Sequence, residues 1–170
     1  MGVTACQDPH EAPRTPAPHL GRPPAPRRLG NRSTSLAGVK ISQELVDEMV
    51  AHAREDLPNE CCGMVGGRDG EATEVIRVVN AAATPLRYEM DPQEQYNALK
   101  TIEDAGNELL AIYHSHTKSA AYPSQTDVNQ AVAWPDQVYV IVSLADEDAP
   151  DVKAYLLKDL RIADVALDVQ

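Results

Sequence analysis

The sequence has few cysteines and no long apolar run, and these absences exclude several classes of protein. Its cysteines are Cys6, Cys61 and Cys62. An odd number with two adjacent in sequence does not indicate a disulfide framework, and no C-x-x-C pair offers a structural zinc site. No apolar run reaches the length that spans a bilayer, and no apolar h-region marks a secretory signal. We therefore expect a cytoplasmic protein in a reduced compartment.

Positive charge is scarce outside the first 36 residues. The whole chain has a net charge of −11, of which residues 1–36 contribute +3, so the remainder carries −14. An acidic domain of this kind disfavours binding of nucleic acid through a broad basic surface. Residues 1–36 also hold seven of the thirteen prolines, no aromatic residue and no periodic pattern. We expect them to be a disordered tail in front of one folded domain at 37–170.

Periodicity within the domain predicts helices that alternate with extended segments. Ser42 and Asp91 are expected to cap two of the helices, and Glu94 to close a capping box with Asp91. Residues 80–90 are expected to be irregular or edge-like. Helices are predicted over 43–55, 92–105 and 124–133, and strands over 61–67, 72–79, 108–114, 137–144, 152–158 and 160–168. This order indicates an α/β or α+β sandwich in which helices cover a central sheet.

The run YHSHTKSAAYPSQTD carries the pattern that points to chemistry. It contains His114 and His116 in the spacing H-x-H, then Ser124 and Asp127 in the spacing S-x-x-D. On a strand the two imidazoles would lie on one face, and Asp127 would lie in the first turn of the next helix. Three protein ligands leave one tetrahedral position for water, which is typical of a catalytic zinc site.

Other interpretations of the same residues are possible. Ser124 and Asp127 can form a capping box without any metal, although this leaves the two histidines unexplained. Ser124 can cap the helix and also contact substrate. Ser115 should point to the opposite face of the strand, so no chemistry is assigned to it. The proton of a metal-activated water needs a further carboxylate as base, and Glu60 in PNECCGMVGG is the candidate.

Taken together, these motifs resemble the JAMM metalloproteases, the catalytic branch of the MPN domain family. The family pattern has a Glu in P-x-E-x-C-G and then H-[ST]-H, seven residues and S-x-x-D. Glu60 stands at the Glu of the first motif, and the second is matched in full by HSH at 114–116 and S-x-x-D at 124–127. The likeness covers roughly residues 38–168.

The resemblance implies an MPN fold, similar to that of cytidine deaminases, with a curved mixed sheet flanked by helices. It implies that His114, His116 and Asp127 bind one Zn²⁺ per chain, whose bound water is the nucleophile. Glu60 would be general base and then acid, and Ser124 would stabilise the oxyanion. Cys62 and Gly63 would be packing positions that hold Glu60 in place.

The resemblance also implies a substrate class. Family members cleave peptide or isopeptide bonds after the C-terminal Gly-Gly of ubiquitin-like proteins, and this chain is most similar to the actinobacterial Mec-type peptidases, which remove cysteine from a sulfur carrier protein. We expect the Gly-Gly tail to add as a strand along residues 81–90. Alternatives are a peptidase for other ubiquitin-like conjugates or C-terminal extensions, and a non-catalytic MPN scaffold. A cytidine deaminase is disfavoured, because H-x-E followed by P-C-x-x-C is absent.

Overall fold

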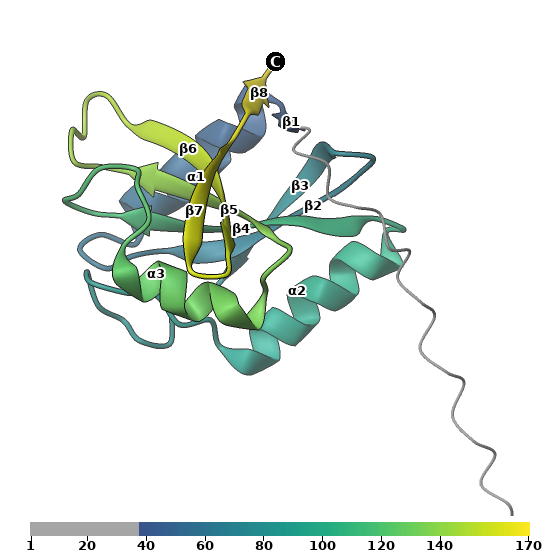
Figure 1. Cartoon of the computed structure of the whole chain (residues 1–170), viewed down its shortest axis with the longest axis horizontal. Coiled ribbons are helices and arrows are strands. Elements are labelled where there is room, and N and C mark those ends of the chain that lie inside the picture. The colour runs from purple at the N-terminus through teal and green to yellow at the C-terminus, as the bar shows by residue number, and fades with distance from the viewer. Residues whose placement is uncertain (1–37) are drawn as a thin grey trace, which may run out of the picture. The chain divides into compact units, whose positions relative to one another are not determined.

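The computed structural model describes residues 38–170, and the tail expected at 1–36 lies outside the described residues. Figure 1 shows the arrangement of the elements. They follow one another as β1 (Val39–Ile41), α1 (Gln43–Glu55), β2 (Cys62–Arg68), β3 (Glu71–Val78), α2 (Pro92–Asp104), β4 (Glu108–His116), α3 (Gln125–Gln130), a 3₁₀ turn η1 (Ala131–Ala133), β5 (Val138–Ser143), β6 (Asp151–Lys158), β7 (Arg161–Val165) and β8 (Leu167–Val169).

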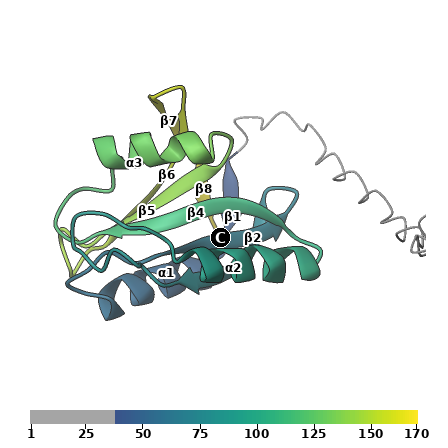
Figure 2. The same ribbon diagram turned by 90° about the horizontal axis from the view of Figure 1, so that it is seen from below.

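The strands form one mixed sheet in the order β7-β6-β5-β4-β2-β3-β1-β8. Neighbouring strands from β7 to β3 are antiparallel except for β4 and β5, and β1 is parallel to both of its neighbours. The core has two layers, one between α1 and the sheet and one that α2 and α3 share with the opposite face. Figure 2 shows the strands lying between α1 and α3. The predicted sandwich with a central mixed sheet is confirmed.

Helix α1 begins and ends where the sequence predicts. The Ser42 side chain accepts a hydrogen bond from the Leu45 amide, which satisfies one of the free amides at the helix start. Val46, Met49 and Ala53 lie on one face and are buried against the sheet. Burial of this stripe fixes α1 on its face of the sheet.

The start of α2 differs in one respect from the prediction. Asp91 caps the helix as expected, because its Oδ1 accepts from the amides of Gln93 and Glu94. Glu94 does not close a capping box with Asp91. Its carboxylate accepts from the Val79 amide at 3.0 Å instead, while the Asp91 amide donates to the Val79 carbonyl. The two bonds tie the start of α2 to the residue that follows β3.

The C-terminal segment also differs from the prediction. A single strand was expected over 160–168, but the segment divides into β7, which pairs with β6, and β8, which pairs with β1. Strand β1 was not predicted either. Three-residue strands are too short to show a period of two, and their pairing joins the two ends of the domain, so only the folded chain reveals them. Of the helices within 38–170, none has the length and apolar character needed to cross a membrane.

Candidate metal centre and catalytic site

The strand β4 carries both histidines to the same face of the sheet. His114 and His116 are its seventh and last residues, and both side chains are buried. Parallel pairing with β5 continues as far as His116 opposite Ser143, so the strand is still extended where the histidines lie. A period of two therefore directs both imidazoles into the layer that contains α3.

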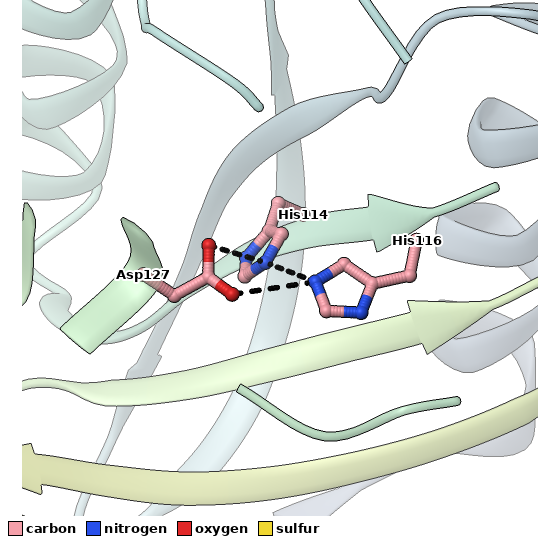
Figure 3. Close-up of side chains that lie close together, drawn as sticks. All are labelled: His114, His116 and Asp127. Carbon is pink, nitrogen blue, oxygen red and sulfur yellow. Dashed lines mark hydrogen bonds and ion pairs between the residues drawn. The ribbon is translucent and has the colours of Figure 1, made fainter. Parts of the chain in front are cut away.

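Asp127 reaches the histidines from the first turn of α3. The Ser124 hydroxyl accepts from the Asp127 amide at 3.2 Å, and the Asp127 carboxylate accepts from the Ser124 amide at 2.6 Å, which completes a capping box. The Asp127 side chain is buried all the same, and it also faces both imidazoles (Figure 3). Capping and convergence with the histidines, which the sequence presented as alternatives, thus occur together.

The three side chains bring two imidazole nitrogens and both oxygens of one carboxylate close together. Nε2 of His114 lies 3.2 Å from Nε2 of His116. Oδ1 of Asp127 lies 3.3 Å from the former atom, and Oδ2 lies 3.3 Å from the latter. Ligands about 2.0–2.1 Å from a tetrahedral zinc are separated by about 3.3 Å. The donor types and their spacing therefore fit one zinc ion, and within residues 38–170 this group is the one that could hold a metal.

The surroundings of the two imidazoles differ. Nδ1 of His116 donates to the Ala120 carbonyl at 3.0 Å, which leaves Nε2 free to face His114 and Asp127. His114 is held by stacking instead, with the Tyr88 ring 4.5 Å away and tilted by 24°. Its Nδ1 is buried and has no hydrogen-bond partner among the described residues. Tyr88 has no counterpart in the sequence motif, and nothing in the spacing could have singled it out.

The protonation of the triad reflects burial and mutual contact. Burial alone would raise the pKa of Asp127, but hydrogen bonds with the two imidazoles hold it well below its usual range. Burial lowers the pKa of His114. Burial has the largest single effect on the pKa of His116 and lowers it, but the contacts with Asp127, the Ala120 carbonyl and Glu60 together raise this pKa above its usual value. A carboxylate that stays ionised beside two imidazoles is the state that metal binding requires.

Glu60 lies at the same end of the sheet as the triad. Cys62 pairs with His114, so the antiparallel register brings Glu60, two residues earlier, level with His116. The Glu60 side chain is buried, and its Oε2 has no hydrogen-bond partner among the described residues. Burial raises the pKa of Glu60 to about 7, with an opposing effect from His116. A carboxyl group with this pKa can both accept and release a proton near neutral pH.

Two other motif positions have structural roles. Ser115 lies between the histidines, and its hydroxyl accepts from the Cys61 amide at 2.8 Å, which links β4 to the segment that carries Glu60. At Gly63 an added Cβ would lie 2.3 Å from the Tyr113 ring and 2.4 Å from the Ile76 carbonyl. Gly63 is therefore a packing position, as expected from the resemblance.

Fold and sequence together define the class of this protein. Residues 42–158 match the family described as prokaryotic homologs of the JAB domain, which spans more than half of the chain. The chain belongs to this family. All five predicted site residues lie inside the matched segment.

Individual relatives narrow the class. The chain is 39% identical over 131 residues to the CysO-cysteine peptidase of Mycobacterium tuberculosis, covering 76% of this chain and 89% of the relative. It is 40% identical over 113 residues to the desampylase of Haloferax volcanii, covering 62% and 80%. Membership of the family and the similarity to these peptidases identify the chain as a JAMM-type hydrolase.

Solved structures show the same fold. The solution structure of protein DSY2949 from Desulfitobacterium hafniense superposes with a TM-score of 0.72 at 34% identity, covering 78% of this chain and 92% of that one. The JAB1/MPN domain protein AF2198 from Archaeoglobus fulgidus gives 0.53 at 21% identity, covering 77% and 98%. The second likeness concerns the fold alone, and it agrees with the expected MPN architecture.

Proposed function

We propose that this protein is a zinc-dependent peptidase that hydrolyses the amide bond after the C-terminal Gly-Gly of a ubiquitin-like sulfur carrier protein and releases cysteine. The observation that carries the proposal is the group of two imidazole nitrogens and one carboxylate, with contacts of 3.2–3.3 Å between neighbouring ligand atoms and with Glu60 level with His116. The similarity to a CysO-cysteine peptidase supports the choice of substrate.

In this proposal His114, His116 and Asp127 hold one Zn²⁺. The chemistry that zinc supplies in such a site is activation of a water molecule and polarisation of the scissile carbonyl. Glu60 takes the proton of the attacking water and returns it to the departing amine. Ser124 is an exposed residue, and its hydroxyl donates a hydrogen bond to the oxyanion that develops on the carbonyl oxygen.

Residues 81–90 provide the proposed edge for the carrier's tail. The segment is not a regular strand, but Thr84 and Arg87 form an antiparallel bridge, and Asn80 and Met90 form another. An extended Gly-Gly tail has no side chains to clash with such an edge, so main-chain hydrogen bonds could hold it close to Glu60. A complex in which the tail lies elsewhere would refute this part of the proposal.

A second candidate is cleavage of other ubiquitin-like conjugates, and the similarity to a desampylase favours it. The two candidates share the same site and differ only in the leaving group. A third, a non-catalytic scaffold, does not need the metal triad. A purified chain that binds no stoichiometric zinc would favour the scaffold over both enzymes.

Mass spectrometry can test the proposal on two defined substrates. One is a carrier with cysteine attached to its terminal Gly-Gly, and the other is the same carrier joined to a lysine side chain of a second protein. We expect loss of cysteine from the first, abolished by a chelator and restored by zinc. Cleavage of the lysine conjugate alone would replace the proposed substrate with the second candidate. No cleavage of either by zinc-loaded protein would contradict both.

We also propose that residues 37–170 form the complete catalytic unit and that the protein acts in the cytoplasm, without nucleic acid or membrane as partner. The acidic charge of residues 37–170 supports the exclusion of nucleic acid as a partner.

A further inference from the structure

Asn80 makes an unusual set of contacts two residues after the end of β3. Its side chain is 8% exposed, and its carboxamide takes part in four hydrogen bonds. Nδ2 donates to the carbonyls of Glu60 at 2.8 Å and Arg87 at 3.2 Å. Oδ1 accepts from the amides of Ala82 at 3.0 Å and Glu89 at 2.9 Å. A carboxamide has two N–H donors and two acceptor lone pairs, so its full capacity is used.

Three of these bonds lie within segment 80–90, whereas the fourth connects the segment to another part of the chain. The bond to the Glu60 carbonyl joins Asn80 to a residue 20 positions earlier. The Glu60 amide in turn donates to the Thr84 carbonyl at 3.1 Å. Both polar groups of the Glu60 backbone therefore end on the same segment, one on a side chain and one on the main chain.

The same segment also reaches the metal centre. Tyr88, which stacks on His114, lies between two of the residues that Asn80 holds. Its carbonyl accepts from the Gln130 side chain at 3.0 Å, which ties the segment to the end of α3. The Asn80 carboxamide is therefore the common junction between Glu60 and the segment that covers one face of His114.

We propose that Asn80 is a positioning residue for hydrolysis, which holds the Glu60 backbone against segment 80–90 so that base, metal ligands and substrate edge keep one geometry. This inference rests on the proposed role of Glu60 as general base. A polar group buried with all four bonds made is costly to disturb. Displacement of a catalytic group by about 1 Å can reduce the rate roughly 100-fold.

Two substitutions separate the contacts of Asn80. Asn80→Asp keeps an acceptor for the Ala82 and Glu89 amides but loses both N–H donors, to the Glu60 and Arg87 carbonyls. Asn80→Ala loses all four bonds. A matched control is Asn107→Ala, because Asn107 donates from Nδ2 to Thr73 and Glu74 (in β3, away from the site).

The kinetic measurement uses zinc-loaded full-length protein and the carrier–cysteine adduct. We expect Asn80→Asp to lower kcat roughly 10- to 100-fold with KM little changed and zinc content intact. Asn80→Ala should lower kcat similarly and also raise KM, because the substrate edge loosens. Asn107→Ala should change neither. Wild-type kcat in folded, zinc-loaded Asn80→Asp and Asn80→Ala would overturn the inference.

Amide hydrogen exchange tests the inference without any substrate. The Glu60 amide should exchange faster in both Asn80 variants than in wild type, whereas the Ala82 and Glu89 amides should lose protection only in Asn80→Ala. Asn107→Ala should leave all three as in wild type. Unchanged exchange at Glu60 in both Asn80 variants would overturn the inference. If wild-type protein cleaves no adduct but Glu60 responds as described, the proposed substrate fails while the coupling of Asn80 to Glu60 stands.

Discussion

At the residue scale, the triad shows how much chemistry a short spacing can encode. His114 and His116 share a face because they lie two apart on a strand, and Asp127 faces them because it stands in the first turn of α3. These relations are local, and so the sequence predicts them. The position of Glu60 level with His116, by contrast, depends on the register between β2 and β4. The sequence therefore made Glu60 a candidate only because a further carboxylate was needed as base, and the family resemblance then supported it.

Asn80 escaped prediction for a physical reason. It is followed by a segment that the sequence shows only to be irregular. Its partners are main-chain groups, which every residue possesses, so no pattern of residue types reveals them. Only the folded chain shows that an asparagine at this position uses all its hydrogen-bonding capacity.

His52 provides a prediction about pH at this scale. The side chain is buried, and its Nδ1 lies 2.8 Å from the Tyr113 hydroxyl. Burial lowers the pKa of His52 below 6.5, although Asp56 opposes the shift. As pH falls below about 6.5, the unfolded chain takes up a proton that the folded state resists, so the free energy of unfolding decreases.

The test compares chemical denaturation of wild type and His52→Gln between about pH 7 and pH 5. We expect the variant to be less stable at pH 7, because it loses the Tyr113 contact, but to lose less stability on acidification. Both proteins keep the same metal ligands, so the difference isolates His52. If the free energy of unfolding fell equally with pH in both proteins, His52 would not contribute to the pH dependence of stability.

At the element scale, caps and turns were predictable where the backbone groups find their partners within a few residues. Ser42 and Asp91 cap α1 and α2, and the link between the strands predicted at 61–67 and 72–79 turns at Asp69 and Gly70, both with positive φ. The errors arose where partners are distant. Glu94 binds the Val79 amide rather than completing a capping box, and β8 pairs with β1 at the other end of the domain. Such choices depend on which backbone groups the fold leaves unpaired.

Strand β2 yields a prediction that links packing to the site. Because an added Cβ at Gly63 would meet the Tyr113 ring and the Ile76 carbonyl, Gly63→Ala should force β2 away from its neighbours. We expect the free energy of unfolding to fall by about 1–3 kcal/mol. Turnover should fall as well, because Glu60 lies three residues before Gly63. Denaturant unfolding that matches wild type would mean that the sheet absorbs the methyl group without strain.

At the scale of the whole molecule, composition predicts a division of the chain after residue 36. The acidic part carries −14 and contains the predicted site residues, whereas residues 1–36 carry +3 and most of the prolines. Composition predicts this boundary because few apolar residues precede it. The order of strands in the sheet could not be predicted in the same way, since it places β4 beside β2 and β5 through pairings between distant segments.

Removal of residues 1–36 tests this division. We expect the shortened chain to unfold with a free energy within about 0.5 kcal/mol of the full chain, as for surface changes that touch no core. Its zinc content and kcat should also be unchanged. A loss of stability or zinc would show that the domain needs these residues. A rise in KM alone would indicate that the arginines contact an acidic carrier.

The central claim is that a zinc site at His114, His116 and Asp127 works with Glu60 as base, and Glu60→Gln tests it most directly. Zinc content and turnover of the carrier–cysteine adduct should be measured on the same sample, with His116→Ala as the comparison. We predict that Glu60→Gln keeps one zinc per chain and loses turnover, whereas His116→Ala loses both. Near-normal turnover by zinc-loaded Glu60→Gln would contradict the account.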